Sequence, residues 1–233
     1  MSSGPRQPPH VSATITREPD IYIQTCIKGV NGITLEDAER IISGDGINCN
    51  WWRSTNTISP REIKERLTEE ELYLHVNKYG SPHPTRPDSV ASQTPFISLT
   101  AGAVSRHILV RTNLIHHAAE TALQFATNSG QYRGDCFLFY CWVVVGLRPA
   151  VPVRHLCEEV RELNTYRRYS AYQTEGEITA KINIPSNQIE AFEHYEIVGP
   201  PKGAFTILPR GEPVYNKHDY MDPNMITNIR QAF

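Results

Sequence analysis

The alternation of apolar and polar residues predicts three short strands, each with one polar face. The first is LYLHVN (72–77), in which Leu and Val residues alternate with Tyr73, His75 and Asn77. Successive side chains of a strand point to opposite faces, so these three polar positions would share one face. We therefore expect a half-buried strand that presents Tyr73 and His75 together.

The second predicted strand is FISLT (96–100), in which Ser98 and Thr100 share one face and Ile97 and Leu99 the other. The apolar face fits a core position. The hydroxyl groups of Ser98 and Thr100 are therefore expected on the polar face of this strand.

The third predicted strand begins within YQTEGEITAKINIPSNQI (172–189), where Glu175 and Glu177 fall on the same face. Two strand steps separate their Cα atoms by about 6.5–7 Å, so both carboxylates can reach one substrate. Their mutual repulsion should raise the pKa of one of them. Paired carboxylates serve in glycosyl chemistry or as metal ligands, and a solvated strand terminus is the third possibility.

The rest of the pattern predicts helices and two further strands. An apolar run, CFLFYCWVVVGL, has the β-branched and aromatic content of a buried strand (136–147), and EHYEIVGP predicts another (193–200). Capping residues and helical spacing predict helices at 34–43, 59–71 and 112–127, with a fourth helical stretch at 156–164.

The order of these elements indicates an α+β domain, with early helices followed mostly by strands and one long helix packed on them. We divide the chain into a disordered arm (1–15), an N-terminal helical segment packed on the core (16–70), the core itself (71–200) and a C-terminal tail (201–233).

Charge and hydropathy narrow the classes of partner. The 233 residues carry 23 Lys and Arg against 25 Asp and Glu, so no global field draws in nucleic acid or an anionic membrane. No apolar stretch reaches the roughly 18 residues of a membrane span, and the N-terminus lacks the apolar core of a signal peptide. We expect a protein that is cytoplasmic, or secreted without a cleavable signal peptide.

Neither the cysteines nor the histidines predict a metal centre. The five cysteines are odd in number and form no CxxC pair, which favours reduced, buried thiols. His116 and His117 are adjacent on a predicted helix and face different directions, and nothing close to Glu175 and Glu177 completes a ligand set. We predict no metal site.

Taken together, the three strands resemble those of the ADP-ribosyltransferase superfamily, the mono-ADP-ribosylating toxins in particular. In that family a first strand carries an Arg or His that holds NAD, and a second has an aromatic-x-Ser-x-Ser/Thr pattern like FISLT. A third begins with Glu-x-Glu, like EGEITAKINIPSNQI. The resemblance covers roughly residues 70–198. It implies two packed, mainly antiparallel β-sheets flanked by helices, with 71–200 as the catalytic core.

The resemblance assigns roles to individual residues. Glu177 would be the catalytic carboxylate that stabilises the oxocarbenium-like charge as nicotinamide leaves, and Glu175 would orient or deprotonate the acceptor. Ser98, supported by Thr100, would position Glu177. The first strand, with His75 and Tyr73, would bind NAD.

One position departs from the family pattern. Toxins that combine a serine strand with Glu-x-Glu carry an Arg on the first strand, and LYLHVN has His75 there instead. Histidine grips a pyrophosphate less firmly than the guanidinium fork of Arg. We expect Arg106 to supply the phosphate contact, with Arg111 and Arg53 as alternatives.

The resulting expectation is an NAD-dependent mono-ADP-ribosyltransferase, a toxin or effector that uses NAD as substrate. The acceptor would be a macromolecule, a protein in preference to a nucleic acid, and a Glu at position 175 goes with arginine or guanidine-like acceptors in this family. Two alternatives stay open: an NAD glycohydrolase that uses the same site with water as acceptor, and a non-catalytic NAD-binding or interaction module.

Overall fold

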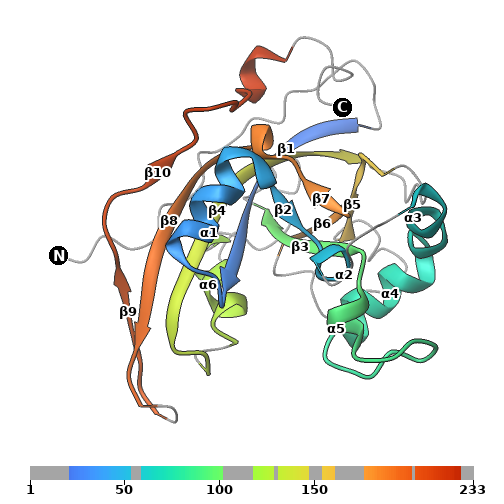
Figure 1. Ribbon diagram of the computed structural model, residues 1–233, viewed down its shortest axis with the longest axis horizontal. Coiled ribbons are helices and arrows are strands. Elements are labelled where there is room, and N and C mark those ends of the chain that lie inside the picture. Colours follow the sequence, from blue (N-terminus) through green and yellow to red (C-terminus); the bar gives the residue numbers. More distant parts are fainter. Residues whose placement is uncertain are drawn as a thin grey trace, which may run out of the picture.

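The computed structural model describes seven stretches of the chain: 21–53, 59–101, 118–128, 131–146, 154–160, 176–200 and 203–226. Strands and helices are mixed along them (Figure 1), which confirms the predicted α+β class.

Five strands pair in a closed ring. Around this ring β1 pairs with β3, β3 with β6, β6 with β5, β5 with β4, and β4 again with β1. Among the described strands only the β4–β5 pairing is parallel, so the expected antiparallel character is confirmed. The ring consists of β1 (Ile21–Asn31), β3 (Phe96–Ala101), β6 (Glu177–Lys181), β5 (Cys157–Glu159) and β4 (Gly134–Gly146).

Further strands extend the ring on one side. β8 (Ile189–Val198) pairs with β4, and both β9 (Thr206–Pro209) and β10 (Val214–Tyr215) pair with β8. These eight strands are therefore continuous, where the family resemblance implied two packed sheets. The second sheet of the structure is small and joins β2 (Ile47–Asn48) to β7 (Asn183–Ile184).

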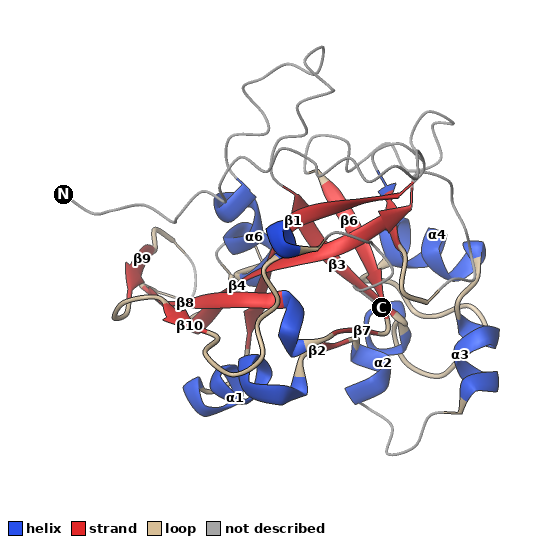
Figure 2. Ribbon diagram, turned by 90° about the horizontal axis from the view of Figure 1, so that it is seen from above, coloured by secondary structure: helices blue, strands red, loops and turns tan. Residues whose placement is uncertain are grey.

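Helices lie around the strands in two groups (Figure 2). α3, α4 and α5 lie together on one side of the strands, whereas α1 and α6 lie away from them. The helices are α1 (Leu35–Arg40), the π-helical turn η1 (Ile41–Asp45), α2 (Asn50–Arg53), α3 (Pro60–Arg66), α4 (Glu69–Lys78), α5 (Val90–Gln93), α6 (Ala118–Ala126), and the 3-10 turns η6 (Ser186–Gln188) and η7 (Pro223–Met225).

Capping residues begin the first helices as predicted. Thr34 and Ser59 each accept a hydrogen bond from the third helical backbone N–H, and the acidic side chain at that position bonds back to the cap. This reciprocal capping box satisfies two backbone donors at each helix start. The helix predicted at 112–127 is confirmed where the structure describes it, over α6.

The predicted strand LYLHVN (72–77) is wrong, because these residues form most of helix α4. Thr68 caps the helix, and three glutamates lie in its first turn. Their negative charges interact favourably with the positive end of the helix dipole. Leu72 and Val76 lie four residues apart and both reach the main core, as a helical stripe does. A spacing of four residues, as between Leu72 and Val76, fits one face of a strand and also one stripe of a helix. In so short a segment, alternation alone could therefore not distinguish the two structures.

β1 was not predicted, and neither was β5. β1 pairs on both sides and its first half is covered on both faces, so even Gln24 and Thr25 are buried. Cys157–Glu159, expected in a helical stretch (156–164), forms β5 between β4 and β6 instead. The charge of Glu158 in this strand is compensated by an ion pair with Lys181.

The C-terminal segment is tied to the sheet and is not a loosely attached tail as far as residue 226. β9 and β10 both pair with β8. Trp142 Nε1 donates a 2.8 Å hydrogen bond to the carbonyl of Met221, and buried Asn216 Nδ2 donates to the carbonyls of Ser186 and Ile189.

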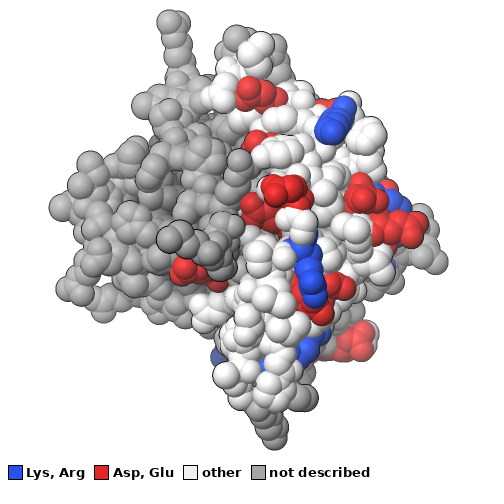
Figure 3. Space-filling model, turned by 90° about the vertical axis from the view of Figure 1, so that its left-hand side faces the viewer, with Lys and Arg blue, Asp and Glu red and all other residues white. Residues whose placement is uncertain are grey.

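The five cysteines are buried and form no disulfide, as the sequence predicted. Most of them belong to the main apolar cluster, which brings together β1, β3, β4, β6 and the helices α2 and α4. Among the described residues, no helix has the length and apolarity that a membrane crossing requires. Acidic and basic side chains are interspersed on the described part of the face seen in Figure 3.

Candidate functional site

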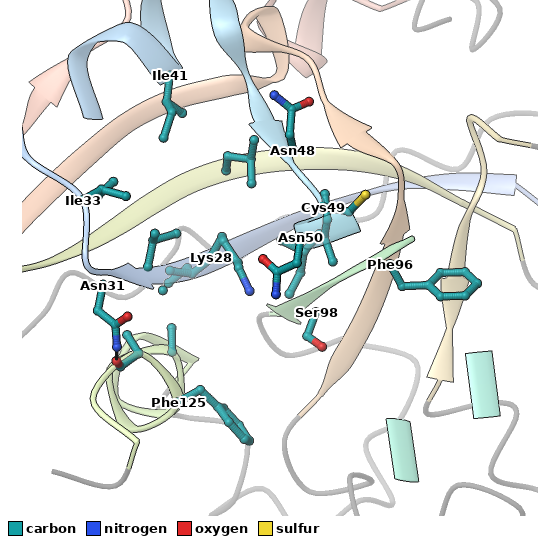
Figure 4. A pocket seen from close by; sticks show the side chains of 18 of the residues that line it. Lys28, Asn31, Ile33, Ile41, Asn48, Cys49, Asn50, Phe96, Ser98 and Phe125 are labelled. Atoms are coloured by element: carbon teal, nitrogen blue, oxygen red, sulfur yellow. Dashed lines mark hydrogen bonds between the residues drawn. The ribbon is translucent and has the colours of Figure 1, made fainter. Parts of the chain in front are cut away.

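A cavity of about 670 Å³ opens between the ring of strands and the helices. That volume is within the range of pockets that hold drug-sized ligands and cofactors. β1 and β3 form its floor, α1 and η1 one end, α2 and α4 the other, and the last turn of α6 a side wall. Figure 4 shows Lys28, Asn50 and Ser98 directed into this space from three different elements.

Glu177 is the first residue of β6 and lies at the cavity, where it is 7% exposed. In the β3–β6 register it is opposite Thr100, while Ser98 is opposite Thr179. Thr179 donates a 3.4 Å hydrogen bond to Glu177 Oε1. The structure thus brings together the carboxylate and the two hydroxyl residues that the sequence predicted as partners.

Gly176 allows the chain to reach β6 at this point. Its φ is +62°, and a Cβ there would lie 3.0 Å from the carbonyl oxygen of Ala101. The same glycine accepts a 2.8 Å hydrogen bond from the N–H of Ala101. A left-handed backbone and this close approach both favour glycine, so the residue between Glu175 and Glu177 fixes where the strand begins.

His75 reaches the site from helix α4, and the helix replaces the predicted strand without removing the residue from the cavity. Its Nε2 lies 2.8 Å from Ser98 Oγ and 3.9 Å from Glu177 Oε1, and its Nδ1 lies 2.8 Å from Thr94 Oγ1. Burial, and secondarily the charge of Lys28, lower the pKa of His75 to about 3. The imidazole is therefore neutral at physiological pH.

Lys28 on β1 was missed by the sequence analysis. It lines the cavity, and loss of hydration on burial lowers its pKa to about 8. The negative charge of Glu177 acts in the opposite direction and the charge of Arg53 adds to the lowering. The signal that could have found Lys28 is the alternation in IYIQTCIK, which predicts a strand with Lys28 on the more polar face.

Arg53 and Asn50 from α2 also line the cavity. Arg53 is exposed at the rim and contacts the side-chain oxygen of Asn50. The amide of Asn50 donates to Tyr79 Oη (3.1 Å) and to the carbonyl of Ala91 (2.8 Å), which fixes α2 against α4 and α5. Of the arginines that the sequence offered for a phosphate contact, Arg53 is the one that lies within the described part of the chain.

Tyr73 does not belong to the site. Its side chain is half-buried against the main apolar cluster and does not line the cavity, because the helix turns it away from His75. Glu175, Arg106 and Arg111 lie outside the described residues. Within the described stretches, no group of His, Cys, Asp and Glu side chains is arranged to hold a metal ion.

No family model and no curated protein matches this chain. Among solved structures 32 chains match. One is "EcPltA", with 9% identity and a TM-score of 0.43, over 85% of this chain and 88% of that one. A heat-labile enterotoxin double mutant has 13% identity and a TM-score of 0.42, over 85% and 64%. Full-length CARDS toxin has 11% identity and a TM-score of 0.44, over 86% and 30%. These values describe a partial likeness in the arrangement of helices and strands.

Proposed function

We propose that the protein is an NAD-dependent mono-ADP-ribosyltransferase that cleaves the nicotinamide–ribose bond and transfers ADP-ribose to a macromolecular acceptor. The observation that carries the proposal is the position of Glu177. A carboxylate, a neutral imidazole, hydroxyl groups and a lysine meet at the floor of one cavity. These are the side-chain groups that cleavage of the nicotinamide–ribose bond, as implied by the sequence motifs, would use.

Glu177 is suited to stabilise growing positive charge. When the bond between nicotinamide and ribose C1′ breaks, its electron pair leaves with nicotinamide and the ribose becomes oxocarbenium-like. A carboxylate fixed in a cleft with little water stabilises that charge far better than solvent does. Glu177 is nearly buried, lies opposite Thr100 in the strand register and accepts a hydrogen bond from Thr179, so it does not need to reorganise as the charge develops.

Lys28 supplies the cation that the family pattern demands on the first strand. The first strand is β1, not LYLHVN, so the missing Arg is replaced by Lys28 and His75 becomes an additional residue. A lysine binds a phosphate as a point charge where an arginine uses a planar fork. Arg53 at the rim is the second cation available to the pyrophosphate of NAD.

The acceptor nucleophile then attacks C1′, forms the new glycosidic bond and loses its proton. Glu175 is proposed as the residue that orients or deprotonates an arginine-type acceptor, on the strength of the Glu-x-Glu motif. With water as acceptor the same site would hydrolyse NAD and release free ADP-ribose.

Incubation of the full chain with NAD labelled in the adenylate part, in the presence of a cell lysate, tests the proposal. We expect label on protein and release of nicotinamide. Glu177→Gln should lower nicotinamide release by about 100-fold or more, the cost of a preorganised charge at the reaction centre, while Glu212→Gln on an exposed loop should not change it. Free ADP-ribose alone would assign a glycohydrolase. Full activity of Glu177→Gln would refute the assignment.

A further inference from the structure

A chain of buried hydrogen bonds leads from Thr94 through His75 to Ser98. The N–H of Phe96 donates to Thr94 Oγ1 over 3.2 Å. Thr94 Oγ1 lies 2.8 Å from His75 Nδ1, and His75 Nε2 lies 2.8 Å from Ser98 Oγ. Thr94 is 2% exposed and His75 3% exposed, so water does not compete for these contacts.

The hydroxyl proton of Thr94 decides which group donates and which accepts in each hydrogen bond. A hydroxyl group has one proton to donate, and here its oxygen already accepts from the N–H of Phe96. Within the described part of the chain, His75 Nδ1 is the acceptor that this proton reaches. Were Nδ1 protonated instead, the hydroxyl proton of Thr94 would be buried without an acceptor, which is costly.

His75 must then carry its proton on Nε2. Because the imidazole is neutral, one nitrogen accepts and the other donates, and the bond made by the first selects the tautomer. Nε2–H donates to Ser98 Oγ, so Ser98 keeps its own proton for a group in the cavity. The opposite tautomer would draw the proton of Ser98 back toward the imidazole.

We propose that Thr94 is a positioning residue that fixes the Nε2–H tautomer of His75, and through it presents Ser98 as a hydrogen-bond donor to the cavity. The kinetic part of this inference rests on the proposed function, since the donor from Ser98 would act on Glu177 or on a ribose hydroxyl of NAD. The tautomer itself does not depend on any activity.

Two variants separate the role of the hydroxyl group from packing. Thr94→Val keeps the shape of the side chain but removes the proton, whereas Thr94→Ser keeps the hydroxyl and removes a methyl group. Thr94→Val should lower kcat for nicotinamide release by about 10-fold, the worth of one hydrogen bond, and leave KM for NAD nearly unchanged. Thr94→Ser should restore most of the loss.

The decisive measurement is the tautomer of His75 in the full chain labelled with ¹⁵N-histidine, with the signal assigned by its absence in His75→Gln. We expect Nε2–H in the wild type and in Thr94→Ser, and a mixture or Nδ1–H in Thr94→Val. A wild type with Nδ1–H, or a Thr94→Val variant that keeps both the Nε2–H signal and full kcat, would overturn the inference. If the wild type releases no nicotinamide, the proposed function fails while the tautomer measurement still decides the role of Thr94.

Discussion

His75 Nε2 lies 3.9 Å from Glu177 Oε1, yet the two side chains do not form an ion pair. Burial and the nearby charge of Lys28 lower the pKa of His75 to about 3, so the imidazole is neutral at physiological pH. The charges of Lys28 and Glu177 interact in the cavity, and Glu177 raises the pKa of Lys28 against the effect of burial. Histidine and lysine therefore have separate tasks: one donates a hydrogen bond, the other carries charge.

The low pKa of His75 predicts a loss of stability in acid. Between about pH 6.5 and pH 3 the unfolded chain binds a proton at His75 that the folded chain does not bind. The free energy of unfolding should therefore fall as the pH falls through this window, by up to about 1.4 kcal/mol per pH unit from this residue.

Urea unfolding of the wild type and of His75→Gln at pH 7 and pH 4.5 measures this effect. The variant should be less stable at pH 7, because it loses the contacts with Ser98 and Thr94, and the difference should narrow at pH 4.5. An equal difference at both pH values would contradict a neutral, buried His75.

Lys28 predicts how NAD binding depends on alkaline pH, on the basis of the proposed function. Its pKa of about 8 means that the ammonium is charged below pH 8 and neutral above it. The affinity for an anionic pyrophosphate should therefore weaken as the pH rises through 8. Titration calorimetry with NAD at pH 7 and pH 9 measures the change. Where turnover interferes, Glu177→Gln can be used, and it should move the change to lower pH because it removes the charge that raises the pKa of Lys28.

Substitutions of Lys28 provide the controls for that experiment. Lys28→Met should raise the Kd for NAD by about 10-fold or more at pH 7, because a hydrogen bond to a charged group contributes about 1.5–3 kcal/mol. Lys28→Arg should retain binding and remove the change between pH 7 and pH 9. Unchanged affinity in Lys28→Met would show that NAD does not bind at this cation.

Gly29 predicts a strong steric effect between β1 and α6. A Cβ at Gly29 would lie 2.2 Å from the carbonyl oxygen of Ala122, a backbone atom that cannot move without the helix. Gly29→Ala should destabilise the protein by about 1–3 kcal/mol, as overpacking of a core does, and lower Tm by about 5 °C. Gly80→Ala, where a Cβ meets nothing within 4 Å, is the matched control. Equal melting temperatures for the two variants would contradict the close approach of α6.

The ion pair between Lys181 and Glu158 predicts a coupled effect on stability. Both side chains are buried, and burial raises the pKa of Glu158 while Lys181 opposes the change. Lys181→Met should cost about 3–5 kcal/mol because it leaves a buried carboxylate without its partner. Adding Glu158→Leu should recover most of the loss in chemical denaturation. Additive losses in the double variant would exclude direct coupling of the pair.

The sequence predicted the polar faces of the site better than the elements that carry them. Ser98, Thr100 and Glu177 lie on strands whose alternation is visible, and these strands were found. His75 was assigned to the cavity through an incorrect strand, because Leu72 and Val76 fit both periods. Lys28 was missed because β1 itself was not predicted, although Ile23 and Ile27 alternate there with Gln24 and Lys28.

The closed ring of strands has a consequence for how the chain reaches its native state. β1 leaves the ribosome long before β3 and β4, the two strands between which it is held. Pairings between strands so distant in sequence form slowly, because the entropy of closing the intervening loop is lost before contacts compensate for it. A nascent chain that stops short of β4 would expose an apolar strand with open edges, so we expect overproduction at low temperature or with chaperones to raise the folded yield.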